Sequence, residues 1–152
     1  LGLLAPNSVA VEFRHSSWVT SEVLPGTLDL LTELGATFVS VDEPRIDAAN
    51  VLPPVTAVTA ESAYVRFHGR NAANWNARTS SAAERFKYLY SAEELLEWME
   101  PVHRLTEQAS TTYLMFNNCY ADYAPKNARQ MLSLFDASVY EEDSDSEEIT
   151  PP

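Results

Sequence analysis

Four short runs of β-branched and aromatic residues recur along the chain, and each ends in polar side chains: 9–14 (VAVEFR), 37–42 (TFVSVD), 63–68 (AYVRFH) and 112–117 (TYLMFN). This composition favours β-strands. Stretches with helical signals separate the runs, and strands that alternate with helices are typical of βαβ units, whose strands lie parallel in one sheet. The sequence therefore predicts an α/β fold.

The helical signal after the first strand is interrupted. Leucines at three-residue steps, with Gly35 as a stop signal, predict a helix within 21–34. Pro25 and the glycine after it are expected to break the start of this helix, so the prediction is restricted to 27–34. The interval 44–54 contains three prolines and no clear periodicity, and it is predicted to be mostly loop.

Two later helices have clearer boundaries. Ser91 and Glu94 form a capping-box pattern before an apolar stripe, and Pro101 is expected to kink or divide the helix that follows. Pro125 suits the first position of a last helix, which is predicted to end near Phe135. These helices complete the alternation expected of βαβ units.

The end of the chain differs from the rest in charge. The chain has a net charge of −12, and 141–148 hold six of its 22 acidic residues. We therefore predict a folded domain over 1–139 and an acidic, disordered tail over 140–152. The acidic balance argues against nucleic acid as a partner, whereas five basic residues within 66–87 favour a small anionic ligand.

Cys119 is the sole cysteine, so no disulfide can form within the chain, and this favours a reducing compartment such as the cytoplasm. No apolar run approaches the roughly 18–20 residues needed to span a bilayer, so no membrane partner is expected. The chain begins at Leu1 and enters strand-like residues almost at once. We therefore expect it to open in the middle of a fold.

Polar side chains gather at the ends of the predicted strands. Parallel strands end at the same edge of a sheet, and α/β folds bind their ligands there, so these side chains are expected to converge. In strand order they are Glu12 and Arg14; Asp42 and Glu43; Arg66, His68, Arg70 and Asn71; and Asn117 and Asn118.

Glu12 and Arg14 are two residues apart and therefore share one face of their strand. One interpretation is an internal salt-bridge ladder with Arg66 that fills the mouth of the fold. In the other, Arg14 and Arg66 clamp a carboxylate or phosphate, and Glu12 orients them or acts as a base. The two interpretations are compatible.

His68 precedes Gly69 and lies between two arginines of the sequence. It could serve as a buried hydrogen-bonding residue, as a general acid–base or as a metal ligand. Glu12, Asp42 and Glu43 could complete a metal site, but no motif of fixed spacing links them. We assign no metal ligand, and any cofactor stays unknown.

The interval 71–91 is long for a connection between a strand and a helix, and loops of this length often cover ligand sites. Trp75 and Tyr88 could cover a ligand ring, and the loop arginines could meet its charge; the alternative is an ordered surface excursion. Asn127 lies in the first turn of the last predicted helix, where free backbone N–H groups favour an anion. Cys119 has no triad pattern around it and receives no catalytic role.

Four segments together resemble the YecE-like family, called domain of unknown function 72: 11–18 (VEFRHSSW), 63–71 (AYVRFHGRN), 88–95 (YLYSAEEL) and 113–128 (YLMFNNCYADYAPKNA). The resemblance implies a TIM-barrel-like (β/α) fold, of which this chain would supply roughly the last four βα units. The N-terminal half of the barrel would be needed to close the sheet. The resemblance implies no activity; by fold alone, such barrels are similar to metal-dependent sugar isomerases and apurinic endonucleases.

These observations favour an enzyme, hydrolytic or phosphate-handling, that acts on a small anionic substrate at the C-terminal mouth of the barrel. His68 would transfer a proton and Glu12 would orient or deprotonate. The predicted substrate-binding residues are Arg14, Arg66, Arg70, Asn71, Trp75, Tyr88, Asn117, Asn118 and Asn127. Two alternatives stay open: a non-catalytic protein that binds an anionic metabolite, and a metal-dependent, endonuclease-like role in DNA repair.

Overall fold

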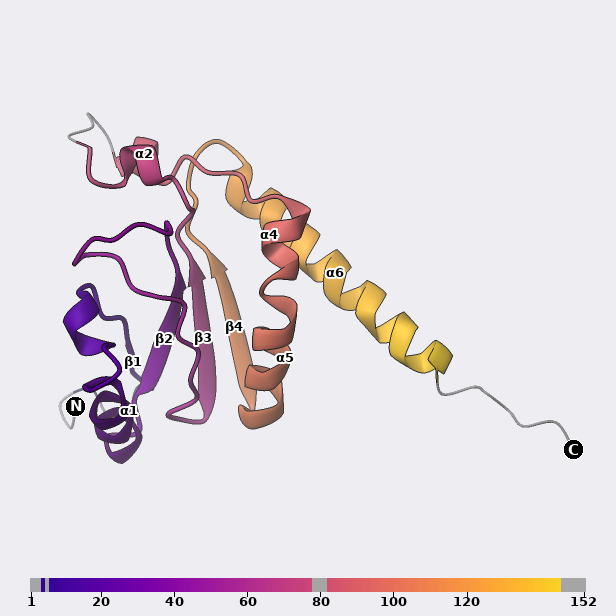
Figure 1. Ribbon diagram of the computed structural model, residues 1–152. Helices are drawn as coiled ribbons and strands as arrows, with labels where there is room; N and C mark the ends of the chain where they lie inside the picture. The colour runs from indigo at the N-terminus through magenta and orange to yellow at the C-terminus, as the bar shows by residue number, and fades with distance from the viewer. Residues whose placement is uncertain (1–3, 5, 78–81, 146–152) are drawn as a thin grey trace, which may run out of the picture.

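The four predicted strands form one parallel sheet in the computed structural model, which describes residues 4, 6–77 and 82–145 (Figure 1). The strands are β1 (Ala10–Val11), β2 (Thr37–Asp42), β3 (Ser62–Phe67) and β4 (Thr111–Phe116). They lie in the order β1-β2-β3-β4, so each strand pairs with the next one along the chain. The prediction of a parallel α/β fold is confirmed.

Helices lie between β1 and β2, between β3 and β4, and after β4, whereas residues 43–61, between β2 and β3, contain no helix (Figure 1). The predicted loop over 44–54 is confirmed. The helical elements are the 3-10 turn η2 (Ser16–Trp18) and the helices α1 (Leu24–Glu33), α2 (Ala72–Trp75), α3 (Ala82–Arg85), α4 (Ala92–Leu96), α5 (Met99–Gln108) and α6 (Tyr123–Asp145). The predicted capping box of Ser91 and Glu94 opens α4. The expected division also occurs, and Pro101 then lies in the first turn of α5, where no intrahelical N–H bond is lost.

The predicted bounds of three elements are wrong: those of α1, β1 and α6. Helix α1 begins at Leu24 instead of residue 27, because Pro25 occupies the first turn, where proline is tolerated. Strand β1 covers Ala10–Val11 instead of 9–14. It lies at the edge of the sheet and pairs with β2 alone, so the chain is free to leave the sheet after Val11.

Helix α6 continues past the predicted end near Phe135 to Asp145. It therefore includes the first residues of the acidic segment 140–152, and 146–152 lie outside the described residues. Within the part of the chain that the structure describes, no helix is long and apolar enough to cross a membrane.

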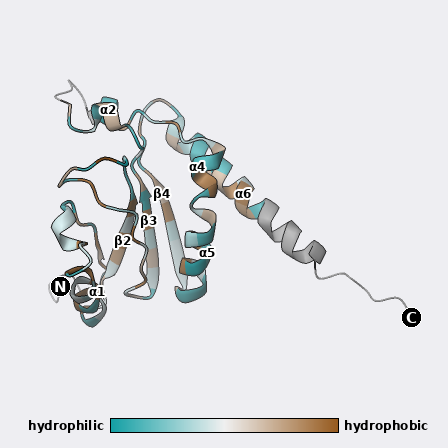
Figure 2. Ribbon diagram, viewed as in Figure 1, coloured by the Kyte–Doolittle hydropathy of each residue, from teal (hydrophilic) through white to brown (hydrophobic). Residues whose placement is uncertain are grey.

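The two faces of the sheet differ in whether helices pack against them. On one face, Val65 and Phe67 of β3 are fully buried in a core with residues of α4, α5 and α6. On the other, Tyr64 pairs with Tyr113 and Arg66 with Met115, and both β4 side chains are largely exposed. Figure 2 shows hydrophilic and apolar residues alternating along α5, as expected of a helix with one face on the sheet. The open face therefore carries the polar residues of interest.

Candidate functional site

The carboxylate of Glu12 lies at the centre of a charged cluster at the strand ends. Its Oε1 accepts a hydrogen bond from Arg14 Nη1 at 2.6 Å and lies 3.2 Å from His68 Nε2. Its Oε2 accepts a hydrogen bond from Arg66 Nη1. The salt-bridge ladder that the sequence suggests is therefore present, and it joins residues from the first and third strand ends.

The two arginines of this ladder remain partly open to solvent. The side chains of Arg14 and Arg66 are 47% and 31% exposed. Within the described residues, Nε and Nη2 of both arginines have no hydrogen-bond partner, so these donors are available to an anion. Beside them is an open hollow of about 270 Å³, lined by Ala10, Glu12, Val39, Tyr64, Arg66, Met115, Phe116 and Asn117.

Glu12 is held as a carboxylate by its neighbours. Burial raises the pKa of Glu12, but hydrogen bonds from His68, Arg14 and Arg66 outweigh it and lower the pKa to about 2. A carboxylate of such low pKa is a weak base. Of the two roles considered for Glu12, the geometry therefore favours orienting its partners over deprotonating a substrate.

The hydrogen bonds of His68 define its tautomer. Asn117 Nδ2 lies 3.3 Å from His68 Nδ1, and because an amide nitrogen donates, Nδ1 is the acceptor. Nε2 then carries the proton and donates a hydrogen bond to Glu12 Oε1, so Arg14 Nη1, 3.3 Å from the same nitrogen, finds no acceptor there. The lone pair of His68 therefore points toward Asn117, a residue of the hollow's wall.

Aromatic side chains of the long loop cover His68, which is 2% exposed. The ring centroids of Trp75 and Phe86 lie 6.4 and 5.9 Å from the His68 ring. Trp75 is itself buried, so it contacts the histidine and not a ligand.

Farther along the loop, Arg85 has a buried Nε without a hydrogen-bond partner among the described residues, and Arg78 lies outside them.

A cation of the chain itself occupies the position that a metal ion would need. Arg14 Nη1 lies 2.6 Å from Glu12 Oε1, 3.1 Å from Glu43 Oε1 and 3.3 Å from His68 Nε2. Among residues 4, 6–77 and 82–145, no group of three His, Cys, Asp or Glu side chains has the arrangement to hold a metal ion. The donor set therefore does not support the metal-dependent endonuclease alternative.

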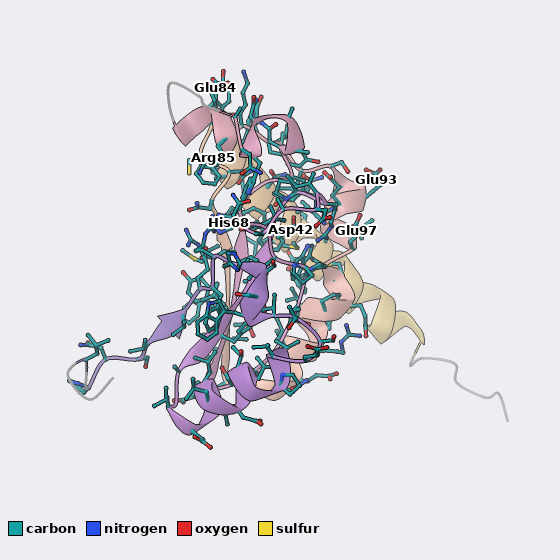
Figure 3. All side chains as sticks on the ribbon, turned by 60° about the vertical axis from the view of Figure 1, so that its left-hand side comes forward. Asp42, His68, Glu84, Arg85, Glu93 and Glu97 are labelled. Carbon is teal, nitrogen blue, oxygen red and sulfur yellow. The ribbon has the colours of Figure 1, made fainter. Side chains whose placement is uncertain are left out.

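Arg70, a predicted anion ligand, is already engaged by Asp42. Its Nε and Nη2 donate to Oδ1 and Oδ2 of Asp42 at 2.8 and 2.7 Å, and Nη2 also lies 2.8 Å from Glu97. The hydrogen bond to Asp42 raises the pKa of Arg70. Figure 3 shows Asp42 between His68 and Glu97. Arg70 thus joins β3 to α4 and has little capacity left for a ligand.

Four other predicted ligand residues make hydrogen bonds that shape the loops. Asn71 caps α2 and donates to the carbonyls of Glu84 and Lys87. The Tyr88 hydroxyl donates to Glu94, and burial, chiefly, raises the pKa of Tyr88 to about 12. Asn118 and Asn127 are buried, and they bond to each other and to the backbones of Tyr88 and Tyr90. The geometry favours structural roles for these four residues.

Glu43 belongs to the cluster, as its place at a strand end predicted, although the sequence suggested no role for it other than that of a metal ligand. It is fully buried, its Oε1 accepts from Arg14 Nη1 at 3.1 Å, and its Oε2 accepts from the backbone N–H of Leu52 at 2.8 Å. Burial raises the pKa of Glu43. Its position directly after a strand buried along its whole length was the available sequence signal.

We expect Glu12 to make the protein sensitive to acid. Its folded pKa of about 2 lies below the ordinary value of 4.5, so its contribution to stability is present above pH 4.5 and is lost as the pH falls toward 2. The variant Glu12→Gln lacks the carboxylate, so its free energy of unfolding should fall less between pH 6 and pH 2. Urea denaturation over this pH range measures the difference. The exposed acid Glu100, changed to Gln, should leave the loss unchanged; equal profiles for both variants would contradict the assignment.

A family model described as "Protein of unknown function DUF72" matches residues 1–149. The UPF0759 protein YunF of Bacillus subtilis (strain 168) is 32% identical over 130 residues, which cover 84% of this chain and 46% of that protein.

Solved structures of DUF72 family proteins agree with this match. One, from Thermotoga maritima MSB8, is 40% identical with a TM-score of 0.75, over 86% of this chain and 47% of that chain. Another, from Enterococcus faecalis V583, is 30% identical with a TM-score of 0.81, over 89% of this chain and 50% of that chain. The chain thus spans about half the length of the relatives it matches.

Proposed function

The chain belongs to the DUF72 family, whose function is unknown, and from the geometry of its site we propose an enzyme that acts on a small anionic substrate. The reaction would be hydrolytic or phosphate-handling. One observation carries the proposal: two part-exposed arginines, Arg14 and Arg66, bind the two oxygens of Glu12 beside His68, at an open hollow. The unused N–H donors of the two guanidinium groups that flank Glu12 suit a carboxylate or phosphate.

In this proposal the arginines bind and His68 moves the proton. Arg14 and Arg66 hold the anion, and Asn117, at the wall of the hollow, donates a hydrogen bond to the substrate. After Asn117 has turned its amide from His68 to the substrate, His68 Nδ1 accepts a proton from a water whose oxygen bonds to the carbonyl carbon or phosphorus of an ester. The bond to the leaving oxygen of the ester breaks, and His68 returns the proton to that oxygen. Glu12 accepts from Nε2–H throughout, so it fixes the ring and stabilises the imidazolium that forms.

The burial of His68 favours a second candidate, a non-catalytic protein that binds an anionic metabolite. With Trp75 and Phe86 against its ring, His68 has almost no contact with solvent. In that case Arg14 and Arg66 would bind the same anion, and the histidine would only position Glu12. A ligand that is recovered unaltered after stoichiometric binding would favour this candidate.

We further infer that the chain forms half of a TIM-barrel-like (β/α) fold. Three observations support it: the sequential parallel order of the strands, the exposed Tyr113 and Met115 on the face away from the helices, and relatives about twice as long. The remaining half would cover that face and pair with the free edges of β1 and β4. The site would then lie at the C-terminal mouth of the barrel.

Calorimetry with inorganic phosphate tests the binding step. We expect Arg66→Ala to weaken phosphate binding at least about tenfold, because a charge-assisted contact is lost. Arg104→Ala is the matched control: it removes an exposed arginine that is paired with Glu100, and phosphate binding should not change.

A panel of phosphate and carboxylate esters tests the chemical step. His68→Gln should abolish turnover of any ester that the unchanged protein hydrolyses, with phosphate binding retained. If neither His68→Gln nor Arg66→Ala altered turnover or binding, the proposed site would be wrong.

A further inference from the structure

We propose that Glu43 is a positioning residue that holds Arg14 in the unliganded site and takes up a proton when Arg14 turns to an anionic ligand. This inference rests on the proposed anion binding by Arg14. It adds that the protonation of Glu43 is coupled to that binding. Glu43 touches no ligand in the proposal, because it is fully buried at the carboxyl end of β2. It acts through Arg14.

Glu12 and Glu43 compete for one nitrogen. Arg14 Nη1 lies 2.6 Å from Glu12 Oε1 and 3.1 Å from Glu43 Oε1. Arg14 is 47% exposed and, within the described residues, its Nε and Nη2 donors are unused, so an anion can reach its guanidinium from solvent. A bound anion would draw it away from one or both carboxylates.

The two carboxylates differ in what remains when Arg14 leaves. Glu12 keeps Arg66 on Oε2 and His68 beside Oε1. Within the described residues, Glu43 has no second ion pair, and its remaining hydrogen-bond donor is the backbone N–H of Leu52. A fully buried carboxylate with one neutral donor is strongly disfavoured, and protonation is the ordinary relief.

The groups around Glu43 act on its pKa in both directions, and Arg14 is one of those that lower it. Burial raises the pKa of Glu43; the Leu52 N–H and the charges of Arg14 and His68 lower it, and Glu12 raises it. Loss of the Arg14 contribution therefore raises the pKa of Glu43 further.

The exchange balances in bonds and charge. The hydrogen bond from Arg14 Nη1 to Glu43 Oε1 breaks, and one from Arg14 to the anion forms. A proton passes from solvent to Glu43 Oε1 and offsets one negative charge of the entering anion. The net charge of the site then stays unchanged for a monoanion and falls by one for a dianion such as sulfate. Anion affinity should consequently rise as the pH is lowered through the pKa of Glu43.

Calorimetry of sulfate binding in buffers of different ionisation enthalpy measures the proton directly. Sulfate is the probe because, unlike phosphate, it does not titrate near neutral pH. We expect the unchanged protein to take up close to one proton per sulfate, as a buffer-dependent part of the binding heat. Sulfate binding without proton uptake would overturn the inference, whether or not any variant folds.

The variant Glu43→Gln keeps an acceptor oxygen and removes the charge that competes for Arg14. We expect it to bind sulfate roughly five- to tenfold more tightly and to take up no proton. Glu100→Gln, the same change at an exposed acid paired with Arg104, should alter neither the affinity nor the proton uptake.

The outcomes separate this inference from the proposed function. If sulfate binding depends on Arg66 but is unchanged by Glu43→Gln and takes up no proton, the role of Glu43 is wrong and the anion site stands. If the unchanged protein binds neither sulfate nor phosphate, both fail.

Discussion

Replacing Asp42 with alanine should lower the free energy of unfolding by about 3–5 kcal/mol, because Arg70 loses its fully buried partner and retains the more exposed carboxylates of Glu94 and Glu97. Asp42 is fully buried and accepts two hydrogen bonds from Arg70. It also accepts from the Tyr90 hydroxyl at 3.1 Å and from the Trp98 indole. The lost carboxylate would leave all of these donors short of an acceptor, at a point that joins β2, β3 and α4–α5.

Urea denaturation followed by circular dichroism measures this effect. Asp29→Ala is the matched control, because Asp29 is exposed on α1; its unfolding free energy should change by no more than about 0.5 kcal/mol. Asp42→Asn should lose much of the same stability, since its amide nitrogen would face donors of Arg70, Tyr90 or Trp98. Similar values for Asp42→Ala and Asp29→Ala would refute the role assigned to this carboxylate.

Gly69→Ala should destabilise the protein by about 3 kcal/mol or more and should also weaken anion binding. Gly69 has a φ of +92°, a conformation that side chains rarely adopt. An added Cβ would lie 2.7 Å from Tyr88 Cβ, and the backbone N–H of Gly69 donates to the Tyr90 hydroxyl. Relief of the clash must move the residue next to His68, so binding should decline together with stability.

Substitutions at two other glycines serve as controls, because they separate the backbone strain of a positive φ from the clash with Tyr88. Gly35 has a φ of +60° and Gly26 lies in α1, and an added Cβ meets nothing within 4 Å at either. Gly35→Ala should cost about 1 kcal/mol for the backbone alone. Gly26→Ala should stabilise the helix by about 0.5–1 kcal/mol. If Gly69→Ala lowered the free energy of unfolding, measured by thermal or urea denaturation, no more than Gly35→Ala, the clash with Tyr88 would not contribute to the loss of stability.

Local patterns in the sequence were sufficient for most of the secondary structure. The bounds of β2 were predicted without error, and those of β3 and β4 to within one residue. The alternation on β3, with Val65 and Phe67 buried and Arg66 on the open face, follows from the two-residue period of a strand. The prediction failed at β1, at the start of α1 and at the end of α6. At β1 and α1 the outcome depended on an edge position and on the first turn of a helix.

The sequence by itself determined the family, the parallel α/β fold and the gathering of charged residues at the strand ends. The sequence also suggested the ladder of Glu12, Arg14 and Arg66 as one of two interpretations. The tertiary structure decided that this ladder forms and that Arg70 pairs with Asp42. Arg70 pairs with Asp42, 28 residues away, whereas Arg66 pairs with Glu12, 54 residues away. Arginine can pair with any carboxylate within reach, so composition and spacing do not select the partner; the register of adjacent strands and the burial of each carboxylate do. For the same reason Glu43 joined the cluster, while Trp75 was buried against His68.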